Sequence, residues 1–294
     1  MEYILTTDRI TKRYKKCTAV NEVSIHIQKG DIYGIIGKNG AGKTTILKLI
    51  SGLIYPTSGS VNMNCKVGAL IESPGFYSNM TAVENVRLKM TYSGIEDKGL
   101  ARELITLVGL DPDSGKKAGD FSLGMKQRLG IAMALVGDPE LMVLDEPING
   151  LDPQGIVEIR DIIHKLNKER GITFIIASHI LEELSKTATR YGIINDGRLI
   201  LELSNEELNA RLSEHIIMQV DDMVKAYAVL TEKGYTSVKR DTAGHMYVFD
   251  KGADSADIVE LLVLAGVKVY SVYKNKESLE EYYISVTTGK GGIR

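Results

Sequence analysis

The chain has 294 residues, of which 44% are hydrophobic and 25% are charged, and this composition excludes a mostly disordered protein. Lys and Arg number 36 against 38 Asp and Glu, so the net charge of −2 offers no general attraction to nucleic acid or anionic lipid. At about 150 residues per domain, the length predicts one large domain or one large and one small domain.

Neither a disulfide framework nor a membrane span is expected. The two cysteines, Cys17 and Cys65, lie too far apart for a metal-binding spacing and are expected in a reducing compartment. The longest apolar stretch, residues 258–269, is interrupted by charged residues and glycine, and it falls short of the roughly 18 residues that a membrane helix needs. The sequence therefore predicts a protein that does not cross a bilayer by itself.

Apolar β-branched runs alternate with helical patterns over the first two thirds of the chain. Strands are predicted at residues 32–36, 66–71, 141–144 and 172–177, and helices at residues 45–50, 82–92, 100–108 and 124–136. A long helix is expected to begin at Pro153, with Asp152 as its N-cap. This alternation predicts a mainly parallel sheet covered by helices.

The pattern changes near residue 204. The order from there is strand 216–220, helix 222–232, strands 237–241 and 247–250, helix 255–265 and strand 267–273, followed by a final helix at 277–285. Thr242, Ala243 and Gly244 form a hairpin signal between the two middle strands. The βαββαβ order is typical of a small ferredoxin-like sandwich. We expect an α/β domain over residues 1–210 and a small α+β domain over residues 211–294.

A glycine-rich loop follows the first predicted parallel strand and fits the pattern G-x-x-x-x-G-K-[ST]. It comprises Gly37, Lys38, Asn39, Gly40, Ala41, Gly42, Lys43 and Thr44. Glycines let backbone N–H groups turn inward, and the following helix start adds a site for anions. We expect Lys43 to contact the β- and γ-phosphates of a nucleotide, Thr44 to ligate Mg²⁺, and Thr45 to add a phosphate contact.

Two carboxylates, Asp145 and Glu146, end the apolar strand at residues 141–144. Taken alone, they are equally consistent with a surface pair before the turn at Pro147. Beside a phosphate loop, we expect Asp145 to hold Mg²⁺ through water and Glu146 to orient and deprotonate the attacking water.

With these motifs in place, residues 2–220 resemble the ATP-binding subunit of ABC transporters. Residues 121–125, FSLGM, are similar to the family's signature segment LSGGQ, and residues 149–152 match its D-loop. The resemblance implies that Ser122 and Gly124 contact the γ-phosphate of ATP held by a second subunit. It also implies that His179 senses and polarises that phosphate and that Tyr14 stacks on adenine. Read individually, Ser122 is equally an N-cap and His179 an ordinary histidine at a strand end.

The sequence departs from the family pattern at three positions. Leu123 and Met125 replace a glycine and a glutamine of the signature, which predicts altered packing at the interface between subunits. Glu72 stands where the family has glutamine, and an ionised glutamate accepts hydrogen bonds but does not donate them. Our hypothesis is that Glu72 still ligates the metal and signals to a membrane partner; the alternative is a loop carboxylate in solvent.

The resemblance implies an ATPase with ATP and Mg²⁺ as ligands, working as a homodimer of cassettes that closes head to tail over two ATP. It also implies transmembrane permease subunits as partners, and a cytoplasmic position on the inner face of the membrane. The Glu72 variant is similar to the subgroup for bacitracin export and lantibiotic self-protection, which implies a peptide antibiotic as cargo. Alternatives are export of another small molecule or ion, a soluble non-transport ABC ATPase, and a regulatory binding module at residues 205–294.

Overall fold

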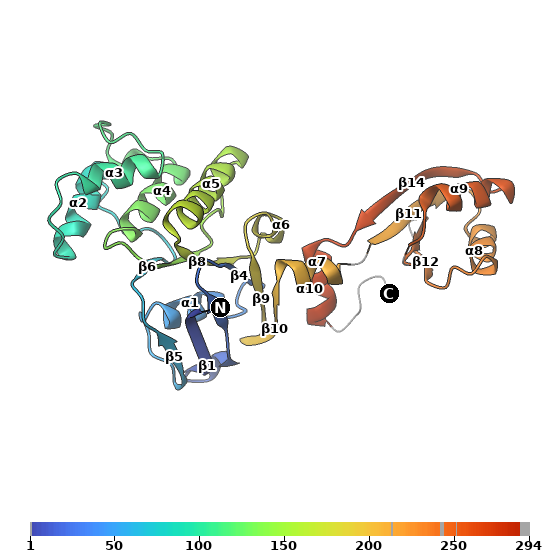
Figure 1. Cartoon of the computed structure of the whole chain (residues 1–294), viewed down its shortest axis with the longest axis horizontal. Helices are drawn as coiled ribbons and strands as arrows, with labels where there is room; N and C mark the ends of the chain where they lie inside the picture. The colour runs from blue at the N-terminus through green and yellow to red at the C-terminus, as the bar shows by residue number, and fades with distance from the viewer. Residues whose placement is uncertain (1, 213, 242–243, 251, 289–294) are drawn as a thin grey trace. The chain divides into compact units, whose positions relative to one another are not determined.

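The computed structural model describes residues 2–212, 214–241, 244–250 and 252–288. The chain divides into two compact units, Met1–Asn205 and Glu206–Arg294 (Figure 1). Among the described residues, none of the helices combines the length and the apolar character required to span a membrane.

A six-stranded sheet forms the centre of the first unit, in the order β10-β9-β4-β8-β7-β6. Its strands are β4 (Ile32–Ile36), β6 (Val67–Leu70), β7 (Leu141–Asp145), β8 (Thr173–Ser178), β9 (Arg190–Asn195) and β10 (Arg198–Ser204). All neighbours pair in parallel except β9 and β10. The predicted parallel sheet is therefore confirmed, and β4, β7 and β8 are buried at every position, as their uninterrupted apolar runs require.

A second, antiparallel sheet of the first unit was not predicted. It contains β1 (Tyr3–Tyr14), β2 (Cys17–Val23), β3 (His26–Gln28) and β5 (Ser58–Met63). Exposed and buried residues mix along β1, and its pairing with β2 shifts register twice. Such irregular strands lack the clean alternation from which a half-buried strand is recognised.

Among its described residues the first unit has six α-helices, of which the first four lie close to their predicted limits, the fifth begins at the predicted Pro153 and the sixth was not predicted. They are α1 (Lys43–Ile50), α2 (Ala82–Tyr92), α3 (Leu100–Leu107), α4 (Leu123–Ala134), α5 (Pro153–Arg170) and the short α6 (Leu181–Ser185). The Asp152 carboxylate accepts a hydrogen bond from the Gly155 backbone N–H, which confirms the predicted N-cap of α5. Helices α2, α3 and α4 group together, away from α1 (Figure 1).

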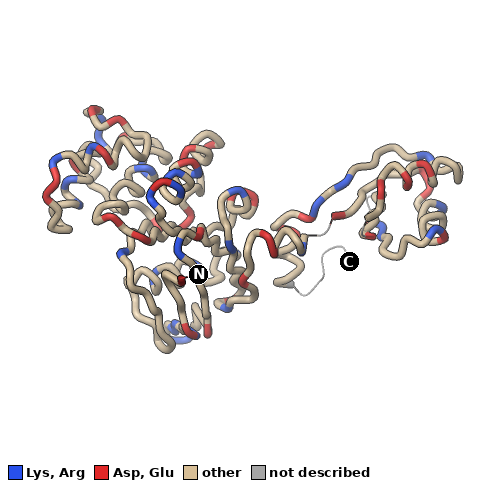
Figure 2. Tube along the Cα trace, viewed as in Figure 1, with Lys and Arg blue, Asp and Glu red and all other residues tan. Residues whose placement is uncertain are grey.

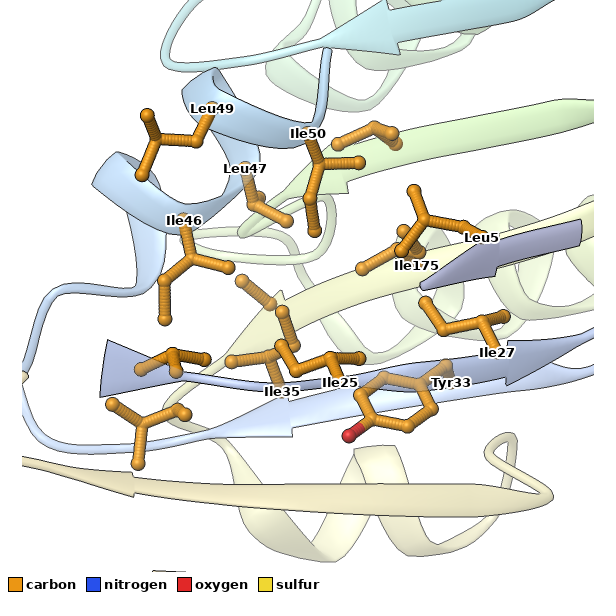
Figure 3. Packing of buried hydrophobic residues seen from close by; sticks show 14 of the residues in the cluster. Leu5, Ile25, Ile27, Tyr33, Ile35, Ile46, Leu47, Leu49, Ile50 and Ile175 are labelled. Carbon is orange, nitrogen blue, oxygen red and sulfur yellow. The ribbon is translucent and has the colours of Figure 1, made fainter. Parts of the chain in front are cut away.

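The main core of the first unit lies between α1 and the two sheets (Figure 3). Ile46 and Leu47 of α1 face Ile35 of β4 and Ile175 of β8, and all four are fully buried. This packing anchors α1 directly after the glycine-rich loop, so the start of the helix has a fixed position.

The second unit contains the predicted βαββαβ order. Its elements are α7 (Asn205–Arg211), which begins at the unit boundary, β11 (Glu214–Val220), α8 (Met223–Glu232), β12 (Val238–Arg240), β13 (His245–Val248), α9 (Ser255–Leu264), β14 (Val269–Lys276) and α10 (Leu279–Thr288). The antiparallel sheet has the order β12-β13-β11-β14, as a ferredoxin-like sandwich requires. β12 and β13 pair as predicted, whereas Thr242 and Ala243 of the hairpin signal lie outside the described residues.

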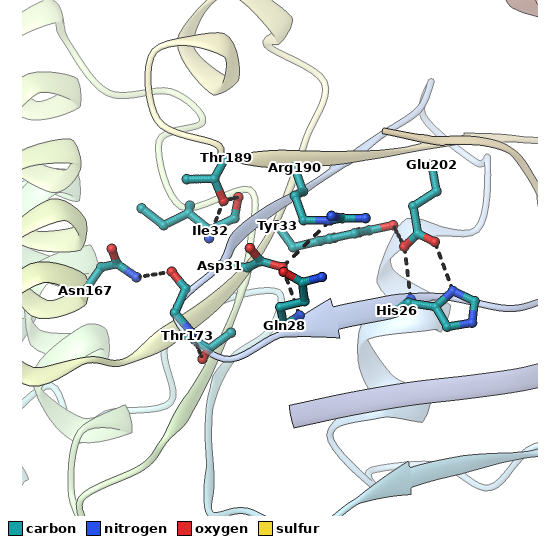
Figure 4. Close-up of polar contacts among 11 residues, drawn as sticks. His26, Gln28, Asp31, Ile32, Tyr33, Asn167, Thr173, Thr189, Arg190 and Glu202 are labelled. Carbon is teal, nitrogen blue, oxygen red and sulfur yellow. Dashed lines mark hydrogen bonds and ion pairs between the residues drawn. The ribbon is translucent and has the colours of Figure 1, made fainter. Parts of the chain in front are cut away.

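Polar contacts join β10 to the start of β4 (Figure 4). The Tyr33 hydroxyl donates to Glu202 at 2.9 Å, and His26 donates its backbone N–H to the same carboxylate at 2.9 Å. Burial and the negative charge of Glu202 raise the pKa of Tyr33 well above its ordinary value, so the phenol stays a proton donor. The contact thus ties the edge strand to the strand that leads into the glycine-rich loop.

We expect Tyr33→Phe to lower the free energy of unfolding by about 2 kcal/mol, because a buried hydroxyl that donates to a charged acceptor is lost. Tyr191→Phe is the matched control, since its buried hydroxyl donates to the neutral oxygens of Ala188 and Asn205. Its loss is expected to be about 1 kcal/mol. Urea unfolding of both variants measures the difference, and an equal loss would contradict the importance of the Glu202 charge.

Candidate nucleotide-binding and hydrolysis site

The sheet order brings separate chain segments together at the C-terminal ends of the parallel strands. β4, β8, β7 and β6 are neighbours and run in parallel. At the ends of these strands lie the glycine-rich loop, His179, Asp145 with Glu146, and Glu72. Ligands of open parallel sheets bind beyond the carboxyl ends of the strands, which is where these residues lie.

Two glycines fix the path of the glycine-rich loop. Gly42 precedes α1 with φ 104°, and a Cβ there would collide with the Ala19 carbonyl oxygen. A Cβ on Gly37 would lie 2.8 Å from the Ile194 carbonyl oxygen. The loop is therefore packed closely against neighbouring backbone, while Lys38, Asn39 and Gly40 form its exposed tip. The start of α1 supplies backbone N–H groups to an anion bound in the loop.

Lys43 is buried and connects the loop to the end of β7. Its ammonium donates to the Gly37 carbonyl oxygen at 2.8 Å and lies 3.3 Å from Glu146 Oε1. The side chain is only 6% exposed, so its charge acts with little screening by solvent. This lysine is placed to exchange a carboxylate partner for a phosphate.

Thr44 and Asp145 form a pair suited to a metal ion. The Thr44 hydroxyl donates to Asp145 Oδ2 at 2.7 Å, while Asp145 Oδ1 is buried and has no hydrogen-bond partner among the described residues. Burial raises the pKa of Asp145, although the Thr44 hydrogen bond and the Lys43 charge oppose that rise. The described residues contain no cluster of three or more His, Cys, Asp or Glu that could hold a metal. One carboxylate, one hydroxyl and phosphate oxygens are a donor set that fits Mg²⁺.

Glu146 lies between Lys43 and His179. Its Oε2 is 2.8 Å from His179 Nδ1 and accepts a bond from the His179 backbone N–H at 3.3 Å. Its backbone has φ 48°, the left-handed region that a non-glycine residue rarely adopts. Such strain concentrates at functional sites, and here it turns the carboxylate toward Lys43 and His179.

Ser122 and Gly124 lie at the start of α4, beside the D-loop rather than in the glycine-rich loop. Ser122 Oγ accepts a hydrogen bond from the Met125 backbone N–H at 3.3 Å, which confirms the N-cap interpretation. A Cβ on Gly150 would lie 3.2 Å from Leu123 Cδ2, so the departure from glycine at Leu123 fills space against residues 149–152. Leu123 itself remains 47% exposed.

Tyr14 and Glu72 occupy the outer part of the site. Tyr14 ends β1 with its ring half-exposed, and the Lys12 ammonium lies 5.4 Å from the ring centroid. Glu72 is exposed and pairs with Lys48, whose Nζ lies 2.6 Å from Glu72 Oε1. Sequence reasoning missed Lys48. The available signal was its spacing four residues after Thr44, which places both on one face of α1.

The fold and site define a P-loop nucleotide-hydrolysing protein. A glycine-rich loop connects the parallel strand β4 to α1, and the buried carboxylate of Asp145 lies at the end of β7, which is separated from β4 in the sheet by β8. The family profile described as ABC transporter matches residues 20–149. The bacitracin transport ATP-binding protein BcrA of Bacillus licheniformis is 40% identical over 98% of this chain and 99% of that protein. The chain therefore belongs to the ATP-binding proteins of ABC transporters, which are ATPases.

Two further comparisons agree. The lantibiotic transport ATP-binding protein SrtF of Streptococcus pyogenes is 42% identical over 68% of this chain and 90% of that protein. A dimeric ATP-binding cassette in a post-hydrolysis state, bound to ADP and Pi, superposes with a TM-score of 0.63 at 26% identity. That match covers 68% of this chain and 98% of the solved one. The expected ABC-type fold and the binding of ATP are thus confirmed.

We expect Asp145→Asn to stabilise the fold in EDTA and to lower Mg²⁺-dependent ATP turnover about 10- to 100-fold. The native carboxyl has a raised pKa, so the folded state loses stability as pH rises through that pKa, and the amide removes this loss. Thermal unfolding at several pH values and a phosphate-release assay measure the two effects. Glu140→Gln, at the opposite end of β7, is the control, and an unchanged turnover of Asp145→Asn would contradict the metal assignment.

Proposed function

We propose that this ATPase drives export of a peptide antibiotic of the bacitracin or lantibiotic type through transmembrane permease subunits. The observation that carries the proposal is the alignment of the whole chain with the bacitracin transport protein at 40% identity. SrtF, by contrast, matches over 68% of the chain. The match to the bacitracin transport protein covers nearly the full length of the chain, including residues of the second unit, so bacitracin-like cargo is favoured over a lantibiotic.

In the proposed hydrolysis, the residues at the C-terminal ends of the parallel strands have separate roles. The glycine-rich loop, Lys43 and Thr45 bind the phosphates of ATP, and Tyr14 stacks on adenine. Thr44 and Asp145 would hold Mg²⁺, which neutralises charge on the phosphate oxygens when bound. Glu146 orients a water molecule in line with the γ-phosphate and takes its proton, while His179 holds the Glu146 carboxylate and polarises the phosphate.

A second copy of the chain completes the site in this proposal. Ser122 and Gly124 stand at the exposed N-terminal end of α4, where backbone N–H groups favour a phosphate. They belong to α4, whereas the glycine-rich loop precedes α1. Two cassettes arranged head to tail would bring each Ser122 to the other's γ-phosphate, and the matched ATP-binding cassette structure is itself a dimer.

The surface is consistent with a protein partner rather than nucleic acid. Lys and Arg are interspersed with Asp and Glu along the trace of both units (Figure 2), and their numbers in the chain, 36 and 38, nearly cancel. Nucleic-acid binding requires a concentrated basic face. We propose that the chain attaches to permease subunits on the inner face of the membrane, in the cytoplasm.

We expect cells that express the chain with its permease subunits to tolerate several-fold more bacitracin, and cells with Glu146→Gln to lose that tolerance. The amide cannot take a proton from water, so ATP binds but is not hydrolysed. Minimal inhibitory concentrations of bacitracin, a lantibiotic and chloramphenicol measure cargo class. Protection against the lantibiotic alone would reassign the cargo, and unchanged inhibition by both peptides would exclude peptide export.

We expect Ser122→Arg to lower ATP turnover by at least about tenfold, because a bulky side chain at the start of α4 blocks the approach of a second cassette. Single-chain ATP binding should stay within about twofold, since Ser122 lies outside the glycine-rich loop. Sedimentation of Ser122→Arg/Glu146→Gln in Mg²⁺ and ATP should show monomers where Glu146→Gln alone shows dimers. Ser114→Arg, at a partly exposed loop position, is the control, and dimers of the double variant would refute the head-to-tail arrangement.

A further inference from the structure

An ion pair links α1 to the segment that follows β6. Lys48 Nζ lies 2.6 Å from Glu72 Oε1, one of the shortest ion-pair distances among the described residues. Lys48 is 31% exposed and Glu72 is 65% exposed, so the pair stands at the rim of the site. The hydrogen bond with Glu72 raises the pKa of Lys48, and the Asp145 charge contributes in the same direction. Lys48 is therefore charged and close to both carboxylates.

The pair repeats, one turn further along α1, the contact that builds the metal site. Thr44 and Lys48 are four residues apart and share a helix face. Thr44 bonds to Asp145 at the end of β7, and Lys48 bonds to Glu72 after β6. β6 and β7 are parallel neighbours, with Leu70 opposite Leu144, so Asp145 at the end of β7 and Glu72 two residues after β6 lie at the same end of the sheet. Glu72 and Asp145 are close enough for the Glu72 charge to raise the pKa of Asp145.

The position of the Glu72 carboxylate has consequences for nucleotide binding. A carboxylate that turned toward the glycine-rich loop would repel the phosphates, whereas one held against α1 has its charge matched by Lys48. The backbone of Glu72 has φ 65°, so its left-handed conformation restricts the directions that the side chain can take. Both features favour the orientation toward α1.

We propose that Lys48 is a positioning residue that holds the Glu72 carboxylate against α1, away from the phosphate and metal positions, in place of the metal contact hypothesised from the sequence. The proposal rests on the proposed roles of the glycine-rich loop and Asp145. This role of Lys48 depends on the glutamate at position 72. A neutral side chain there would carry no negative charge to be kept away from the phosphates.

A double-mutant cycle separates positioning from simple attraction. A lysine that acted only as a fixed charge would contribute equally whether or not Glu72 is present, so its loss would be additive. If Lys48 positions Glu72, Lys48→Gln releases the carboxylate toward the phosphates, and the loss depends on Glu72. The four proteins are the wild type, Lys48→Gln, Glu72→Gln and the double variant.

The readout is equilibrium binding of a fluorescent ATP analogue, first in EDTA and then in Mg²⁺. In EDTA we expect Lys48→Gln to weaken binding about two- to fivefold in the wild type and by less than about 1.5-fold in Glu72→Gln, as befits a partly exposed pair. Mg²⁺ should shrink the defect of Lys48→Gln, because a released carboxylate is attracted to the cation. This rescue should be absent in the double variant.

Lys29→Gln is the matched control, because Lys29 pairs with Glu140 near the N-terminal ends of β4 and β7, away from the nucleotide site. It should bind the analogue as the wild type does, and all variants should unfold at similar temperatures. Equal losses on Lys48→Gln in both backgrounds, or no rescue by Mg²⁺, would overturn the positioning role while leaving the nucleotide site intact. Failure of the wild type to bind the analogue would overturn the nucleotide site as well.

Discussion

The buried ammonium of Lys43 is the contact that joins the separate parts of the site. It bonds to the Gly37 carbonyl oxygen within the glycine-rich loop and faces Glu146 beyond β7, which in turn contacts His179 beyond β8. Three chain segments therefore share one small cluster of charges. In a poorly solvated cluster a charge must keep a partner, so a phosphate that takes Lys43 also changes the surroundings of Glu146.

That cluster depends on a core that fixes its supports. Ile46 and Leu47 pack α1 against the buried faces of β4 and β8, so the helix start cannot shift without loss of apolar contacts. The glycines act within the loop, where a Cβ on Gly37 would crowd the Ile194 carbonyl oxygen and a Cβ on Gly42 would collide with the Ala19 carbonyl oxygen. The rigidity of the loop thus comes from packing on one side and from close backbone approach on the other.

Sequence patterns predicted the parts of this protein that are buried and regular. The strand at residues 32–36 and the N-cap Asp152 have local signals that tertiary structure does not override. β1 escaped prediction because its pairing with β2, β3 and β5 shifts register, so its buried residues do not recur at every second position. Lys48 escaped because its partner Glu72 is distant in the sequence, and only the sheet order brings them together. The spacing of Lys48 from Thr44 indicates a shared helix face, but neither composition nor spacing identifies Glu72 as its partner.

Two glutamates that follow adjacent strands both have a left-handed backbone conformation. Glu72 after β6 and Glu146 after β7 both have positive φ, at 65° and 48°. A left-handed residue turns the chain sharply at a strand end, which lets the side chain return toward α1 and the glycine-rich loop instead of continuing along the strand. Each carboxylate forms an ion pair with a lysine of α1: Glu146 with Lys43 and Glu72 with Lys48. Because α1 bears both lysines, the segment after β6 and the segment after β7 each form an ion pair with the same helix.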